Sequence, residues 1–110
     1  SINSATEGYQ FFYFATSGNG ILRFNKFTKS FDINLTQAQG IKSDIIKHVY
    51  FDEYTGILWA VGNKSLEFSQ NREGNWININ LSSLSIRSFE DINDIGPQKT
   101  SSGLELIKDL

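Results

Sequence analysis

The sequence of 110 residues has no cysteine, one proline and one histidine. Without cysteine the chain has no disulfide, no thiolate metal ligand and no cysteine nucleophile. The single proline, Pro97, is compatible with many ordered strands, because proline removes a donor from a β-ladder. The lone histidine, His48, has no convergent ligands in the sequence, so we expect it to be structural. We therefore expect no catalytic residue, no metal site and no cofactor.

The sequence also lacks a strong excess of either charge and has no long apolar run. Ten basic and 12 acidic residues give a net charge of −2, and no run of lysine and arginine occurs. A nucleic-acid partner is therefore not expected, since phosphate binding needs a concentrated basic surface. No apolar run approaches the roughly 18 residues of a membrane span, and residues 1–8 lack the pattern of a signal peptide. We expect neither a membrane span nor a signal peptide in this sequence.

Aromatic residues are abundant, with nine Phe, four Tyr and two Trp, and they favour strands. Short aromatic or β-branched runs alternate with Gly- and Asn-rich turns, as in an all-β fold. Residues 1–8 are small and polar and predict a flexible lead-in. Arg23 is expected to point outward from its strand. The strands are expected at residues 9–16, 21–24, 30–34, 45–52, 57–61, 65–69 and 76–81.

Part of the sequence occurs twice. Ile33-Asn34-Leu35-Thr36 returns 46 residues later as Ile79-Asn80-Leu81-Ser82, and Ile41-Lys42-Ser43 returns 45 residues later as Ile86-Arg87-Ser88. A period of about 45 residues is typical of one four-stranded propeller blade. The repeat therefore predicts a β-propeller segment.

Aligning the two copies pairs their strand residues. Phe14 aligns with Trp59 at 45 residues, and Leu22 and Phe24 align with Leu66 and Phe68 at 44 residues. Aromatic residues that recur at the blade period are interpreted as core packing rather than as a sugar-stacking surface. This interpretation applies to Phe14, Phe31, Trp59 and Trp76.

The alignment predicts about two four-stranded antiparallel blades. After the lead-in of residues 1–8, residues 9–110 form the propeller segment, with a partial blade at 9–34, a full blade at 35–81 and a partial blade at 82–110. Repeats of this kind bury their apolar faces only against neighbouring repeats. We therefore expect either the remaining blades of one polypeptide or copies of the chain itself to complete the propeller.

Residues 35–46 and 51–60 resemble the two-component-regulator propeller repeat. The resemblance consists of the loop ending Gly40-Ile41-Lys42-Ser43, then Asp52, the turn at Gly56 and the pair Leu58-Trp59. It implies a bacterial extracytoplasmic location, in the periplasm, at the cell surface or in secretion. It also implies a propeller that binds or scaffolds a protein or a glycan and is not an enzyme.

Three functions remain open at this point. The first is a non-catalytic binding or scaffolding segment of an envelope protein. The second is the oligosaccharide-sensing propeller of a hybrid two-component system, which requires a membrane span and a kinase elsewhere in the polypeptide. The third is a propeller hydrolase or lyase, which needs paired carboxylates or a histidine-based site and is disfavoured by the lone His48.

Blade topology locates a candidate binding surface in the loops of one rim. These are Thr36–Asp44, Ser82–Ser88, Ser17–Gly20 and Gly62–Lys64, and function on a β scaffold concentrates in such loops. The candidate ligand-binding residues, chosen for their amide or charged groups, are Gln37, Gln39, Lys42, Asp44, Asn63, Lys64 and Arg87.

Other polar residues have simpler interpretations. Asp52 is expected to accept backbone N–H groups in the turn that ends at Gly56, and Gly56 is expected to have a positive φ. Tyr54 lies in the same polar turn and is expected to be exposed. The acidic cluster of Glu90, Asp91 and Asp94 is interpreted as a solvated loop, because it lacks the ligand spacing of a calcium loop.

Overall fold

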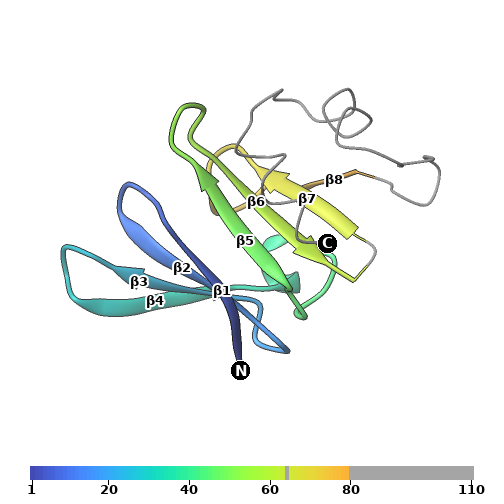
Figure 1. Cartoon of the computed structure of the whole chain (residues 1–110), viewed down its shortest axis with the longest axis horizontal. Coiled ribbons are helices and arrows are strands. Elements are labelled where there is room, and N and C mark those ends of the chain that lie inside the picture. The colour runs from blue at the N-terminus through green and yellow to red at the C-terminus, as the bar shows by residue number, and fades with distance from the viewer. Residues whose placement is uncertain (64, 80–110) are drawn as a thin grey trace.

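The computed structural model describes residues 1–63 and 65–79, and these residues fold into two four-stranded antiparallel sheets (Figure 1). Sheet A contains β1 (Ile2–Glu7), β2 (Phe11–Thr16), β3 (Ile21–Asn25) and β4 (Ser30–Leu35), in that order. Sheet B contains β5 (His48–Asp52), β6 (Ile57–Gly62), β7 (Ser65–Ser69) and β8 (Ile77–Ile79), also in that order. A short 3-10 helix, η1 (Gln37–Gln39), lies between the sheets in the sequence. The all-β prediction is confirmed.

Within the described part of the chain, no helix is long and apolar enough to cross a membrane. The expected partial blade at 82–110 lies outside the described residues.

The strand expected at residues 45–52 begins later than predicted, at His48. Its first residues are used between the sheets: Ile45 forms an isolated bridge with Ser17, and the Ile46 N–H donates to the Thr16 carbonyl oxygen at 2.8 Å. These residues therefore tie sheet B to the β2–β3 hairpin before β5 pairs with β6.

The flexible lead-in expected at residues 1–8 is wrong, because Ile2–Glu7 forms β1 and pairs with β2 along its length. This strand is polar because it contacts sheet B through hydroxyl groups and not through apolar side chains. Ser4 Oγ accepts from the Val49 N–H at 2.9 Å, and Thr6 Oγ1 accepts from the Phe51 N–H at 3.1 Å. Sheet A is consequently a complete four-stranded unit rather than the partial blade predicted at 9–34.

Strands β1 and β5 lie side by side and run in the same direction (Figure 1). From this pair, each sheet adds its remaining strands in sequence order. The core lies between the two sheets. It is formed by Phe11, Tyr13, Ala15, Ile21, Leu35, Ile41, Ile46, Val49, Phe51, Leu58 and Ala60.

The two sheets meet with opposite faces. Tyr13 and Ala15 of sheet A contact the core between the sheets, whereas Trp59 and Phe68 belong to a second cluster on the other face of sheet B. Two sheets related by rotation about a shared strand direction meet in this head-to-tail way. The structural counterpart of Trp59 is therefore Tyr13, 46 residues earlier, and not Phe14 at 45 residues.

This change of one residue reverses which face of sheet A is buried. Arg23, expected to point outward, is only 7% exposed. Phe31, expected in the core, is 61% exposed, and Phe14 is only half-buried. Trp59 is 2% exposed, so the core prediction is confirmed for that residue.

Candidate functional site

The loop Thr36–Asp44 is built around a capped 3-10 turn. Thr36 has extended backbone angles, and its hydroxyl accepts the Ala38 N–H at 3.2 Å. Gln39 Oε1 accepts the Thr36 N–H at 2.7 Å, which completes a capping box. Gly40 ends the turn with a φ of +106°, which favours glycine. The local sequence therefore holds this loop in one conformation.

The same loop is bonded to the β2–β3 turn, Ser17–Gly20. The Asp44 carbonyl oxygen accepts from the Gly18 N–H at 3.1 Å and from the Gly20 N–H at 2.8 Å. The Asp44 carboxylate accepts the Gln37 N–H at 2.9 Å. The two loops thus lie side by side at one end of the sheets, and we keep the name rim for them.

A buried carboxylate joins this loop to sheet B. Glu67 of β7 is 3% exposed, and its two oxygens accept the Lys42 N–H at 2.9 and 3.3 Å. Asn78 Nδ2 donates to the same carboxylate at 3.2 Å. Glu67 was not among the residues predicted from the sequence. One signal was present, because its charge is flanked by the apolar residues Leu66 and Phe68.

The described candidate residues divide into two groups. Gln39 and Asp44 use their side chains to stabilise the loop, while Gln37, Lys42 and Asn63 are exposed; the Gln37 amide also donates to the Lys42 carbonyl oxygen at 3.4 Å. Lys64 and Arg87, like the loop Ser82–Ser88, lie outside the described residues.

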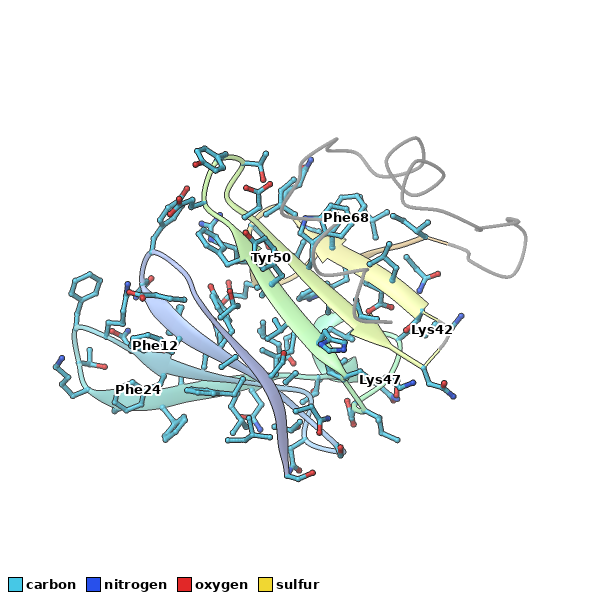
Figure 2. All side chains as sticks on the ribbon, in the orientation of Figure 1. Phe12, Phe24, Lys42, Lys47, Tyr50 and Phe68 are labelled. Carbon is cyan, nitrogen blue, oxygen red and sulfur yellow. The ribbon has the colours of Figure 1, made fainter. Side chains whose placement is uncertain are left out.

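The exposed members of the rim carry amides and cations. Lys42 and the neighbouring exposed Lys47 lie at the same end of the molecule (Figure 2). Together with the amides of Gln37 and Asn63, they offer hydrogen-bond donors and positive charge from the loop Thr36–Asp44 and from the ends of β5 and β6. This arrangement suits binding of a polar ligand.

Residues 1–63 and 65–79 contain no group of three or more His, Cys, Asp or Glu side chains placed to hold a metal ion. His48 is half-buried on β5 and lies opposite Val61 of β6. The acidic cluster of Glu90, Asp91 and Asp94 lies outside the described residues.

The turn after β5 has the predicted structure. Asp52 Oδ1 accepts the Tyr54 N–H at 3.0 Å, and the Asp52 carbonyl oxygen accepts the Gly56 N–H at 2.8 Å. Gly56 has a φ of +74°, and Tyr54 is 84% exposed. These predictions for Asp52, Gly56 and Tyr54 are confirmed.

Comparison with known proteins adds no relative: no protein-family model matches the chain, and no curated protein matches it. The resemblance of residues 35–69 to two-component-regulator propeller repeats therefore stays a prediction from the sequence. A functional proposal has to come from the geometry of the two sheets and their rim.

Proposed function

We propose that this chain is a non-catalytic binding and scaffolding segment of a β-propeller, in which its two sheets act as neighbouring blades. The observation that carries the proposal is the head-to-tail packing of sheet B on sheet A around the parallel strands β1 and β5. The outer face of sheet A is left open by this contact, so a further unit can be added there in the same head-to-tail way.

The outer face of sheet A supports this proposal. In sheet B, the face that carries Leu58 and Ala60 packs against sheet A. The corresponding face of sheet A is apolar, and its members Phe31 and Ile33 are 61% and 74% exposed. The half-buried members of this face are Phe12, Phe14, Leu22 and Phe24; Figure 2 labels Phe12 and Phe24. An exposed apolar face of this extent is typical of an interaction surface, and we assign it to another sheet of the same repeat.

The rim of Thr36–Asp44 and Ser17–Gly20 is the second part of the proposal. Its loops are fixed by hydrogen bonds, while Gln37, Lys42 and Asn63 present exposed polar groups. We assign to it the binding of a protein or a glycan. A bacterial extracytoplasmic location follows from the resemblance and belongs to the same proposal.

Sedimentation velocity tests the scaffolding role. We expect the wild-type chain to self-associate through the exposed apolar face as its concentration rises. The double variant Phe31→Lys/Ile33→Lys places two charges on that face, so it should sediment as a monomer over the same range. Both side chains are already exposed, so the variant should fold normally.

The matched control is Tyr54→Lys, which changes an aromatic residue that is 84% exposed in the β5–β6 turn. It should associate like the wild type. A wild-type chain that remains monomeric at every concentration would overturn the scaffolding proposal, and so would equal loss of association in the control.

A further inference from the structure

A cavity of about 180 Å³ lies between the two sheets, at the edge opposite to the rim. The β1–β2 turn, the β7–β8 turn and the inner face of sheet A line it, and it is partly open to solvent. Its lining residues are Tyr9, Gln10, Phe11, Tyr13, Arg23, Asn71, Arg72 and Glu73. Two guanidinium groups line the cavity: Arg23 comes from β3 of sheet A, and Arg72 comes from the β7–β8 turn of sheet B.

The first guanidinium, that of Arg23, is buried with little neutralising charge. Its Nε donates to the Ile33 carbonyl oxygen at 2.9 Å, and its Cζ lies 4.8 Å from the centre of the Phe11 ring. Its Nη1 is 3.4 Å from Glu73 Oε1, and the Glu73 side chain is 68% exposed. Guanidinium carries five N–H donors, and among the described residues only Nε and Nη1 of Arg23 have hydrogen-bond partners. The remaining N–H donors of this guanidinium give it the capacity to bind a second anion.

The second guanidinium is held by backbone groups. Arg72 Nη1 donates to the carbonyl oxygens of Gly56 at 2.9 Å and Gln70 at 3.2 Å, and its Cζ lies 5.8 Å from the centre of the Tyr9 ring. Arg72 has a φ of +62°, a left-handed conformation that is unusual for a residue with a side chain. These contacts fix its positive charge beside the cavity without a carboxylate partner among residues 1–63 and 65–79.

The third polar group is the hydroxyl of Tyr13, a residue that is 1% exposed. Burial raises the pKa of this hydroxyl above 10.0, and the charge of Glu73 acts in the same direction, whereas the charges of Arg72 and Arg23 oppose it. The hydroxyl is therefore neutral at physiological pH and can donate a hydrogen bond.

The charges that face the cavity do not cancel. Arg23 and Arg72 are positive, and Glu73 is the one carboxylate among the lining residues. Glu73 also shows which chemistry the cavity accepts, because its own carboxylate reaches the Arg23 guanidinium from the solvent side. Carboxylates pair with the planar fork of guanidinium. Tyr9 and Phe11 line the cavity beside these groups, so an apolar stem attached to the carboxylate can pack against their rings.

We propose that this cavity is a binding site for a small organic carboxylate, in which Arg23 and Arg72 bind the anion and the Tyr13 hydroxyl donates to it. Glu73 competes with the ligand for Arg23, so the site is weakened by the chain's own carboxylate. The proposal does not depend on whether the chain associates with other copies or with further blades, because every lining residue comes from one chain.

Isothermal titration calorimetry with the whole chain tests the site, using benzoate as the probe and its neutral analogue benzamide as the comparison. Benzoate should bind and benzamide should not. Arg72→Gln removes one cation from a partly exposed position and should weaken benzoate binding about tenfold, the effect of losing one charge-assisted hydrogen bond. Glu73→Gln should strengthen it severalfold, because the competing carboxylate is gone.

Lys26→Gln is the matched control. Lys26 lies in a neighbouring groove and is paired with Glu7 at 2.9 Å, so its loss should leave benzoate binding unchanged. Circular dichroism of each variant checks that both sheets remain folded.

Three results would overturn the proposal: no heat from benzoate with the wild-type chain, equal binding of benzamide, or unchanged affinity in Arg72→Gln. Inorganic phosphate that binds more tightly than benzoate would also overturn it, since the site would then select phosphate rather than carboxylate.

Discussion

Sheets A and B both have four strands in sequential order but differ in how many of their faces are buried. Every residue of β6 and every residue of β7 is buried. In sheet A, by contrast, β2 and β3 alternate between buried and half-buried residues. Strands that are covered on both faces are buried along their whole length, whereas strands covered on one face alternate between buried and more exposed residues. The difference indicates that sheet A has one packed face and one open face.

The open face of sheet A nevertheless has the composition of a packing surface. Phe24 and Phe31 lie on adjacent strands with ring centres 5.1 Å apart in an edge-to-face arrangement. Lys26 Nζ lies 5.7 Å from the centre of the Phe12 ring on the same sheet. Aromatic pairs of this kind are common in sheet cores. The comparison of the two sheets therefore predicts which substitutions are costly and which are tolerated.

The largest expected effect distinguishes a buried aliphatic residue from an exposed one. Leu58 is 0% exposed between the sheets, and Leu58→Ala should lower the free energy of unfolding by about 2–5 kcal/mol. Ile33 is 74% exposed on the open face of sheet A, so Ile33→Ala should change it by less than about 0.5 kcal/mol. Urea unfolding measures both values. Similar costs at the two positions would contradict the assignment of the open face.

The next effect concerns the contact between β1 and β5. Thr6→Val keeps the shape of the side chain but leaves the Phe51 N–H without its acceptor, which should cost about 1–3 kcal/mol. Thr28→Val is the control, because the Thr28 hydroxyl contacts only Ser30 at an exposed turn. Equal melting temperatures for the two variants would show that this contact contributes nothing to the packing of the sheets.

A smaller effect compares equivalent turns in the two sheets. Asn25 Oδ1 accepts the N–H groups of Phe27 and Thr28, and Asn71 Oδ1 accepts those of Glu73 and Gly74. Asn25 is 5% exposed, whereas Asn71 is exposed. Asn25→Ala should therefore cost about 1 kcal/mol in denaturant unfolding, and Asn71→Ala should cost less. The reverse order would mean that burial does not set the strength of these turns.

The smallest effect is expected in alkali. The folded chain holds the Tyr13 proton more tightly than the unfolded chain, because burial raises its pKa above 10.0. Stability is then complete below that value and falls as the pH rises above it. Part of this loss is already present at pH 10, since half of an unfolded tyrosine is ionised there. Tyr13→Phe should reduce the loss measured between pH 9 and pH 10; a parallel decline in both proteins would contradict it.

Most strand positions and the turn chemistry could be predicted from the sequence, whereas β1 and the orientation of the strand faces could not. The turn at Asp52 and Gly56 follows local rules that need no knowledge of the rest of the fold. In β2, however, Phe11-Phe12-Tyr13-Phe14 is aromatic at every position, so hydrophobicity does not indicate which two residues are buried. Arg23 pairs with Tyr13 and lies on the same face of sheet A, so its burial could not be predicted either.

The candidate rim shows the same limit. The loops Thr36–Asp44 and Ser17–Gly20 could be placed together from topology alone. The structural use of Gln39 and Asp44 could not, because both side chains bond within the loop and resemble exposed polar residues in the sequence. The inter-sheet cavity was missed because Arg23 and Arg72, 49 residues apart, meet only through packing.

The hydroxyls of Ser4 and Thr6 also occupy donors on a strand edge that, among the described residues, has no strand partner in its own sheet. The N–H groups of Val49 and Phe51 lie on the edge of β5 that β6 does not occupy, and such an edge can recruit a strand from another molecule. Because two short side chains already accept these N–H groups, the edge offers fewer donors to an incoming strand. Removing both hydroxyls would convert a contact between the sheets into a template for misassembly.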